Sequence, residues 1–186
     1  MSSKVDLSGF DNAWYQPGRG TLVRLLWLLV SALFVQSAVV PMSGLRVWLL
    51  RLFGAEIGQG VVIKPRVQVK YPWRLKVGDH VWIGEGVWID NLANVSIGSH
   101  VCLSQESYLL TGNHDYRAAN FDLMIGEIQL RDGAWVGARA VVCPGVEMNE
   151  DAILAVGSVL SADAEPAMIY RGNPAKAIRP RYCEDG

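Results

Sequence analysis

Three histidines are the side chains of this sequence best suited to acid–base chemistry, because imidazole gains and loses a proton near neutral pH. His80 and His100 occupy the same place in two similar segments, Val77-Gly-Asp-His and Ile97-Gly-Ser-His. Their equivalence predicts a solvated pair at turn positions. His114 stands instead at the root of a loop that interrupts the pattern of the chain. It is the candidate general base, and an ordinary loop histidine is the alternative.

The interrupted pattern is a six-residue repeat that runs from Ile57 to about Glu165. An aliphatic residue begins each of fifteen hexads, and a small or β-branched residue stands fifth in most of them. This period fits neither an isolated helix nor a simple strand. It predicts an all-β solenoid in which each hexad forms one short side and a turn, and in which neighbouring coils bury one another's inner faces.

Three hexads make one coil, which predicts a triangular prism. Ile57, Val77 and Ile97 follow one another at intervals of 20 residues, that is, three hexads plus two inserted residues. Leu130 and Met148 are 18 residues apart, without an insertion. The period does not determine the handedness of the coil.

Residues 115–127 are additional to the repeat, so we expect a 13-residue loop to leave the prism directly after His114. The loop contains four large apolar residues, Tyr116, Phe121, Leu123 and Met124. We expect it to pack against a neighbouring subunit. Tryptophans near the prism faces, such as Trp82, also favour a closed oligomer, because monomers rarely expose large apolar patches.

Residues 1–54 precede the prism. The polar start predicts an extended arm, and the apolar runs 25–40 and 45–53 predict two helices, the first of which Pro41 ends. The uncharged run of sixteen residues is short for a bilayer span, which needs about 20. Residues 1–53 carry a net charge of +3. Three interpretations remain: residues 21–53 pack on the prism end or a neighbouring subunit, lie peripherally on an anionic membrane, or span it.

Net charge and cysteine spacing limit the kinds of ligand that the protein is expected to bind. A net charge of −1 gives no indication of nucleic-acid binding. The three cysteines show no metal or disulfide spacing, so we expect no metal, and a cytoplasmic setting fits. We divide the chain into a helical start (1–54), the prism (55–166) and a tail (167–186). In the tail, Asn173-Pro174 predicts the start of a short helix.

Several motifs carry a family resemblance. The hexads that begin at Val136 and Val142, and the closing segment Arg171–Arg179, resemble the hexapeptide-repeat acyltransferases. Four further segments resemble the colanic-acid-biosynthesis acetyltransferases within that superfamily: Asp6–Phe10, Leu50–Ala55, Tyr71-Pro-Trp73 and Thr111-Gly-Asn-His-Asp115. The resemblance covers nearly the whole chain. It implies a left-handed parallel β-helix, a homotrimer, and acetyl-CoA as co-substrate.

The resemblance also implies roles for single residues. In that family the catalytic histidine ends a coil just before the loop, which implies that His114 is the general base. Asn113 and Asp115 are candidates to orient its ring. The acceptor would bind on the other side of His114, near Trp88, Asp90, Asn91 and Tyr108. The alternative for this set is solvated turn residues, with Trp88 at a subunit interface.

Coenzyme A would lie in a groove between subunits along the C-terminal coils. The residues implied there are Trp135, Gly137, Ala138, Ala155, Val156, Gly157, Ser158, Ser161, Lys176 and Arg179. A solvated basic tail is the alternative for the last two. Two segments depart from the family. Leu154-Ala-Val-Gly-Ser158 replaces Ile-Gly-Ala-Gly-Ser, and Ser161-Ala-Asp163 replaces Thr-Lys-Asp, which removes one basic contact.

The function implied is an acetyl-CoA-dependent O-acetyltransferase for a sugar hydroxyl of an exopolysaccharide (colanic-acid-like) precursor, with a lipid-linked precursor among the candidates. Such an enzyme would be cytoplasmic or peripheral at the inner face of the cytoplasmic membrane. One alternative is a soluble acetyltransferase for a free sugar, a nucleotide-sugar amine or another small acceptor. A zinc-dependent carbonic-anhydrase-like β-helix and a non-catalytic scaffold are the others.

Overall fold

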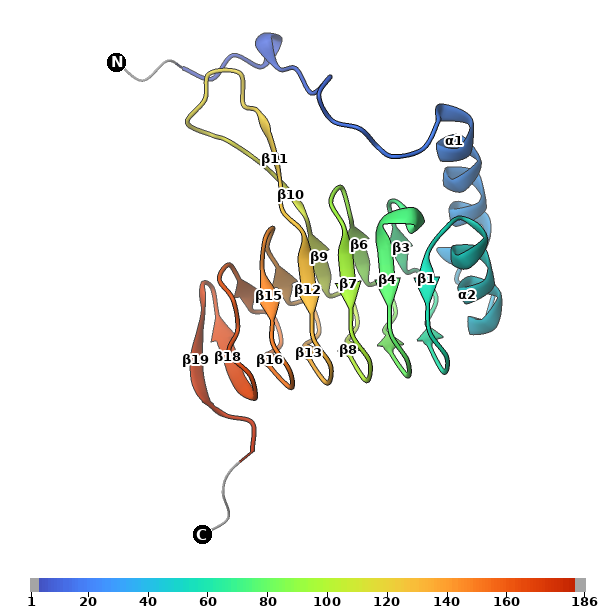
Figure 1. Ribbon diagram of the computed structural model, residues 1–186, viewed down its shortest axis with the longest axis vertical. Helices are drawn as coiled ribbons and strands as arrows, with labels where there is room; N and C mark the ends of the chain where they lie inside the picture. The colour runs from blue at the N-terminus through green and yellow to red at the C-terminus, as the bar shows by residue number, and fades with distance from the viewer. Residues whose placement is uncertain (1–3, 183–186) are drawn as a thin grey trace.

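The computed structural model describes residues 4–182 and consists of an N-terminal arm, two helices and a parallel β-helix (Figure 1). The arm is extended, as expected, apart from the 3-10 turn η1 (Leu7–Gly9). Helix α1 (Thr21–Val30) continues into the π-helical turn η2 (Ser31–Val35), and α2 (Ser43–Leu52) follows. A further 3-10 turn, η3 (Pro72–Arg74), interrupts the first coil.

The β-helix has three faces, each a parallel sheet to which every coil adds one strand. The first face comprises β1 (Glu56–Ile57), β4 (Leu75–Val77), β7 (Val95–Ile97), β12 (Ile128–Leu130) and β15 (Glu147–Met148). The second comprises β2 (Val62–Ile63), β5 (Trp82–Ile83), β8 (Cys102–Leu103), β13 (Trp135–Val136) and β16 (Ile153–Leu154). The third comprises β3 (Gln68–Val69), β6 (Trp88–Asp90), β9 (Tyr108–Leu110), β14 (Val141–Val142) and β17 (Val159–Leu160).

The register between coils follows the sequence repeat. Ile57 pairs with Val77 and Val77 with Ile97, so the predicted 20-residue interval is confirmed. The aliphatic residues that begin the hexads form the core, and all are buried except Ile57 of the first coil, which is partly covered. Each coil thus buries its inner face on its neighbours, which is why a six-residue pattern specifies this fold.

The two N-terminal helices cover the end of the β-helix at the first coil (Figure 1). Trp27 of α1 is buried, and its Nε1 donates a hydrogen bond to the Val69 carbonyl at 2.9 Å. Ser43 of α2 accepts one from the Ile63 amide at 2.8 Å. The predicted packing of the two helices on the end of the prism is therefore confirmed for the helix face that contacts the first coil. Within residues 4–182, no helix is long and apolar enough to cross a bilayer.

The inserted segment is a β-hairpin. Strand β10 (Gly112–His114) pairs antiparallel with β11 (Leu123–Ile125), so His114 lies inside the hairpin rather than at the end of the prism. The predicted exit directly after His114 was therefore wrong by three residues, because the hairpin begins at Gly112. The chain departs early because the two strands then satisfy each other's backbone groups, and a count of hexads does not register that pairing.

The helix predicted in the tail from Asn173-Pro174 was also wrong. Strand β18 (Met168–Gly172) continues the second face beside β16, and β19 (Ala175–Pro180) pairs antiparallel with β18. Asn173 and Pro174 form the turn between them. Asparagine followed by proline suits a tight turn as well as a helix start. The open edge of β16 decides between the two, because it offers the backbone partners that a helix would leave unpaired.

Candidate active site

His114 is held by Phe121 in the loop of its own hairpin and by Phe10 of the N-terminal arm. Its Nδ1 lies 2.9 Å from the carbonyl oxygen of Phe121. Its ring stacks on the Phe121 ring, with centroids 4.4 Å apart and planes 7° from parallel. The Phe10 ring of the arm lies 5.6 Å from the imidazole centroid at a tilt of 57°. These contacts fix the plane and the direction of a half-buried imidazole.

The Phe121 carbonyl also selects the tautomer of His114. A carbonyl oxygen only accepts hydrogen bonds, so the neutral ring carries its hydrogen on Nδ1 and leaves a lone pair on Nε2. No group within residues 4–182 hydrogen-bonds to Nε2. A neutral imidazole in this orientation is able to accept a proton from a ligand hydroxyl.

The side chains of Asn113 and Asp115 do not orient the ring. Asn113 Oδ1 accepts the backbone amide of His114 at 2.8 Å, and Asp115 Oδ1 accepts the amide of Arg117 at 2.9 Å. The expectation for this pair was wrong, because each side chain accepts a backbone amide and neither hydrogen-bonds to the imidazole. The partner of the ring therefore comes from across the hairpin.

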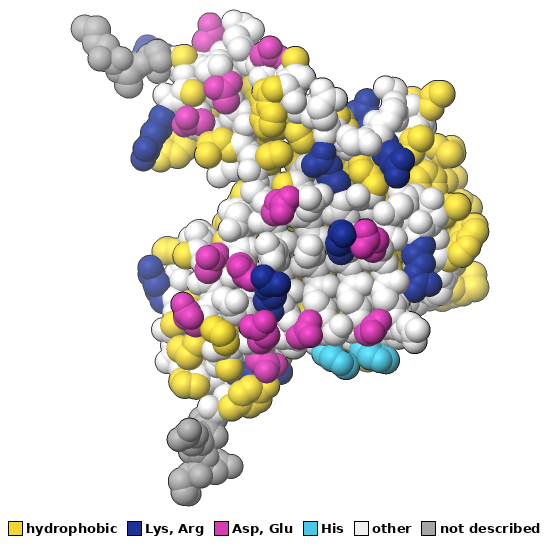
Figure 2. All heavy atoms as spheres, viewed as in Figure 1, with side chains coloured by type: hydrophobic (Ala, Val, Ile, Leu, Met, Phe, Trp, Pro, Cys, Tyr) yellow, Lys and Arg dark blue, Asp and Glu magenta, His cyan; other side chains and the backbone are white. Residues whose placement is uncertain are grey.

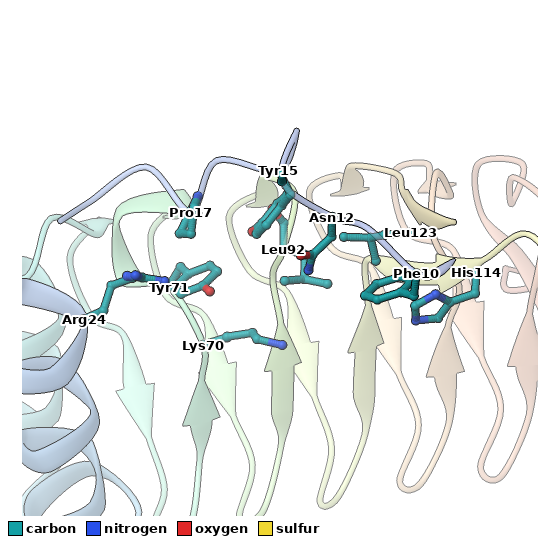
Figure 3. A pocket seen from close by; sticks show the side chains of 11 residues that line it. Phe10, Asn12, Tyr15, Pro17, Arg24, Lys70, Tyr71, Leu92, His114 and Leu123 are labelled. Carbon is teal, nitrogen blue, oxygen red and sulfur yellow. The ribbon is translucent and has the colours of Figure 1, made fainter. Parts of the chain in front are cut away.

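A cleft of about 660 Å³ opens beside His114, between the N-terminal arm and the edge of the first coils (Figure 3). Its lining comes from the arm, α1, two coils and the hairpin: Phe10, Asn12, Ala13, Tyr15, Pro17, Arg24, Lys70, Tyr71, Leu92, His114 and Leu123. Sequence reasoning missed the arm residues. The only signal for them was the resemblance of Asp6–Phe10 to the family.

Hydrogen bonds along its length fix the arm above the coils. The Asp6 amide donates to the Ala119 carbonyl at 2.7 Å, which ties the arm to the hairpin. The Tyr15 hydroxyl donates to the Leu92 carbonyl at 2.8 Å, and Trp73 Nε1 donates to the Pro17 carbonyl at 2.7 Å. Burial raises the pKa of Tyr15 to about 12, so its hydroxyl keeps the proton that it donates. The arm therefore forms one wall of the cleft.

None of the four expected acceptor residues lines this cleft. Asp90 Oδ1 is 2.8 Å from Lys70 Nζ, and Tyr108 donates to Asp90 Oδ2 at 3.3 Å. Burial, and then the charge of Asp90, raise the pKa of Tyr108 to about 12. Trp88 stacks on Tyr108 with centroids 4.6 Å apart. Asp90 thus reaches the cleft only through Lys70.

Asn91 has a structural contact instead of the acceptor role expected for it. Its side chain is fully buried. Its Oδ1 accepts the Tyr71 amide at 2.9 Å, and its Nδ2 donates to the Tyr71 carbonyl at 2.7 Å. These bonds join two successive coils at the turn where η3 begins, and burial keeps the amide out of reach of a ligand in the cleft.

The residues expected to bind coenzyme A gather on neighbouring turns of the C-terminal coils. The Gly137 amide donates to the Leu154 carbonyl at 2.8 Å, and the Gly157 amide donates to the Ala138 carbonyl at 2.9 Å. Any Cβ on Gly137 would lie 2.7 Å from the Val156 nitrogen, so this close approach requires glycine. The structure therefore brings the two predicted segments side by side.

The side chains of this set differ in exposure. Val156 is 71% exposed, and Trp135, Ser161, Lys176 and Arg179 are exposed as well. The indole Nε1 of Trp135 donates to Ser104 Oγ at 2.9 Å. The Ser158 side chain is buried, and its hydroxyl accepts the Gly172 amide at 3.0 Å. Ser158 therefore anchors the terminal hairpin and offers no side-chain contact to a ligand.

His80 and His100 form the solvated pair that their spacing predicts. Both are exposed, both have positive φ angles at turn positions, and their rings stack with centroids 5.3 Å apart. Cys102 and Cys143 are free thiols whose pKa burial raises, as expected for small residues of the repeat. Cys183 lies outside the described residues.

Comparison with known proteins agrees with this architecture. No protein-family model matches the sequence. The chain is 37% identical over 177 residues to the putative colanic acid biosynthesis acetyltransferase WcaF of Escherichia coli K12, which covers 95% of this chain and 97% of that protein. The corresponding protein of Shigella flexneri matches to the same extent.

Solved structures confirm the left-handed β-helix. A hexapeptide-repeat containing acetyltransferase from Vibrio cholerae superposes with a TM-score of 0.79 at 23% identity, over 95% of this chain and 98% of that one. A galactoside acetyltransferase solved with coenzyme A superposes with a TM-score of 0.70 at 20% identity, over 87% and 82% of the two chains. By its sequence and its fold, the chain belongs to the hexapeptide-repeat acetyltransferases.

Proposed function

We propose that this protein transfers an acetyl group from acetyl-CoA to a hydroxyl of a carbohydrate acceptor, an exopolysaccharide precursor of the colanic-acid kind, with His114 as general base. The observation that carries the proposal is the imidazole at one end of a cleft large enough for a glycosyl unit, with Nδ1 fixed on the Phe121 carbonyl and Nε2 free. The relationship to WcaF supports the pathway.

Two solved relatives support acetyl-CoA as the donor. The Vibrio cholerae acetyltransferase has a structure in complex with acetyl coenzyme A, and the galactoside acetyltransferase has one with coenzyme A. In this chain the exposed turns around Trp135 and Val156, with Lys176 and Arg179 on β19, are the proposed donor site. The two basic side chains would meet the phosphates of coenzyme A.

The proposed reaction needs one proton carrier. Nε2 of His114 removes the proton of the acceptor hydroxyl while its oxygen attacks the thioester carbon. The resulting tetrahedral intermediate collapses by breaking the carbon–sulfur bond. The imidazolium returns the proton to the leaving sulfur, so the products are an O-acetyl ester and coenzyme A. The Phe121 carbonyl stabilises the imidazolium because it accepts from Nδ1–H throughout.

We further propose a homotrimer that contacts the membrane peripherally. Exposed leucines on α1 and η2 support the membrane contact, and their side chains gather over the N-terminal helices beside Lys and Arg residues (Figure 2): Leu22, Leu25, Leu26, Leu28, Leu29 and Leu33. An apolar helix face with basic neighbours suits an anionic bilayer surface. The trimer is supported by the family and by the exposed tryptophans Trp82, Trp88 and Trp135.

The test of this function first measures binding of the acetyl donor and then identifies the acceptor. The unfolding midpoint of the protein should rise with acetyl-CoA and with coenzyme A, because a ligand that binds only the folded state stabilises it. Release of the coenzyme A thiol is then followed with methyl glycosides and with amino sugars. Ester formation on the glycosides supports the proposal. Amide formation confined to the amino sugars would establish an N-acetyltransferase instead.

A further inference from the structure

The cleft beside His114 is cationic at its far end. Among its lining residues Arg24 and Lys70 carry positive charge, and none of the lining residues is a carboxylate. Figure 3 shows Arg24 extending from α1 toward Tyr71, and Lys70 pointing along the cleft toward the end that holds His114. A ligand that fills the cleft therefore meets an imidazole at one end and two cations at the other.

Arg24 has little to satisfy it within the described chain. Its Nη2 donates to Thr21 Oγ1 at 3.1 Å, and its buried Nε has no hydrogen-bond partner in residues 4–182. No carboxylate of that part of the chain forms an ion pair with it. The neighbouring Arg74 differs, because it donates to the Leu92 and Gln16 carbonyls. A guanidinium that has one hydroxyl acceptor and no carboxylate, beside a cleft, is suited to an anionic ligand.

Lys70 is only partly neutralised. Its ammonium group lies 2.8 Å from Asp90 Oδ1, and the Asp90 side chain is 12% exposed against 40% for Lys70. The carboxylate therefore holds the ammonium group from behind and leaves part of it facing the cleft. The charge of Lys70 is partly neutralised by Asp90. Arg24 adds a positive charge that no carboxylate of residues 4–182 pairs with.

The position of the cations relative to His114 fits a substituted sugar. Lys70 directly follows β3, and the hairpin of His114 leaves the coil two turns later, after β9. At the roughly 4.8 Å spacing of hydrogen-bonded strands, two coils correspond to about 10 Å along the prism axis. A glycosyl unit whose hydroxyl reaches Nε2 would thus place a group attached to it near the two cations.

A second hollow of about 380 Å³ begins at the same cations and runs along α1. Arg24, Lys70 and Tyr71 line both hollows, and apolar residues of α1 such as Leu25 and Leu28 continue the second one. A ligand that extends from His114 through both hollows would therefore meet first the imidazole, then a cleft of the size of a glycosyl unit, then the two cations, and finally the apolar groove.

We propose that Arg24, assisted by Lys70, forms a subsite for a phosphate group esterified to the acceptor sugar. This proposal rests on the proposed function, because it assumes that the reacting hydroxyl lies at His114. Guanidinium groups bind phosphate through paired charge-assisted hydrogen bonds. The phosphate belongs either to a lipid carrier, whose chain would enter the groove along α1, or to a nucleotide.

The first experiment measures anion binding without turnover. The unfolding midpoint of the full-length protein saturated with coenzyme A is recorded with and without inorganic pyrophosphate, for wild type, Arg24→Gln and Arg66→Gln. Arg66 is an exposed arginine of the first coil, paired with Glu85, and its loss changes the net charge equally. Pyrophosphate should raise the midpoint of wild type and Arg66→Gln and leave that of Arg24→Gln unchanged.

Two results would overturn the subsite: no rise in wild type, or an equal rise in Arg24→Gln. The rise caused by coenzyme A alone tests the donor site separately, so a failed subsite remains distinguishable from a failed function. Saturation with coenzyme A matters because it occupies the phosphate contacts of the donor site before pyrophosphate is added.

The second experiment identifies the source of the phosphate. KM is compared for a free glycoside, a farnesyl-diphosphate-linked sugar and a nucleoside-diphosphate-linked sugar. The subsite should lower KM by roughly 10- to 100-fold for the linked acceptor that it binds, and Arg24→Gln should remove most of that advantage. The linked acceptor with the lower KM identifies whether the phosphate belongs to a lipid carrier or to a nucleotide. Equal KM values for all three acceptors would contradict the proposal.

Discussion

The imidazole Nδ1 of His114 lies 2.9 Å from the carbonyl oxygen of Phe121, seven residues further along the chain. The two residues occupy opposite sides of one hairpin, and their rings stack at 4.4 Å. The catalytic candidate and the group that orients it thus belong to the same extruded segment. The prism positions the base of this hairpin, and the hairpin itself determines which nitrogen is free.

Replacement of His114 by alanine should abolish most transfer while the fold and donor binding persist. A positioned general base contributes about 10²- to 10⁴-fold, so we expect a fall in kcat of that order. The measurement is thiol release at saturating acetyl-CoA, together with the rise in unfolding midpoint that coenzyme A causes. His100→Ala is the matched control, because His100 is an exposed turn residue. Near-normal turnover in His114→Ala would refute the assignment.

Phe10 tests whether the arm contributes to catalysis. Phe10→Ala removes the ring that lies 5.6 Å from the imidazole centroid, so the imidazole gains freedom to rotate. Misplacement of a reacting group is costly, and we expect kcat/KM to fall roughly 10- to 100-fold. Leu7→Ala truncates an exposed arm residue that does not line the cleft and serves as control. Equal kinetics in the two variants would assign the arm a purely structural role.

Asn91 should matter for stability rather than for acceptor binding. Asn91→Ala leaves the amide and the carbonyl of Tyr71 without their buried partner, at a cost of about 2 kcal/mol. For a chain of this length that corresponds to a fall of roughly 4–8 °C in the unfolding midpoint. Asn94→Ala removes an exposed hydrogen bond to Glu127 and should change the midpoint little. A variant with normal stability and a raised acceptor KM would restore the acceptor role.

Alkaline stability should depend on two tyrosines. The folded state raises the pKa of Tyr15 and Tyr108 to about 12, whereas a tyrosine of an unfolded chain ionises near pH 10. Below about pH 10 both states keep the phenolic protons, so these groups cause no pH dependence there. Between about pH 10 and 12 the unfolded state loses protons that the folded state retains, and stability falls as pH rises.

The corresponding measurement is the unfolding midpoint across that interval. Tyr15→Phe/Tyr108→Phe should show a shallower decline than wild type, because neither ring then has a proton to lose. An equally steep decline in the double variant would show that other groups govern alkaline unfolding.

The sequence by itself determined the β-helix, its coil length and its register. The aliphatic residue that begins each hexad is the one whose side chain points inward. Ile83 and Leu103 could therefore be placed in the core from the sequence alone. It also placed His114 at the inserted segment and His80 with His100 on the surface. These are local or periodic properties, and neighbouring residues encode them.

Only the tertiary structure decided how the site is completed. The Phe121 carbonyl carries no side-chain signal, and the approach of Phe10, Arg24 and Lys70 joins segments far apart in the chain. Asn91 could not be separated from a ligand-binding amide until its two bonds to Tyr71 were seen. The terminal hairpin likewise depended on the open edge of β16. Such contacts depend on which backbone groups remain unpaired after folding, and a one-dimensional pattern does not record them.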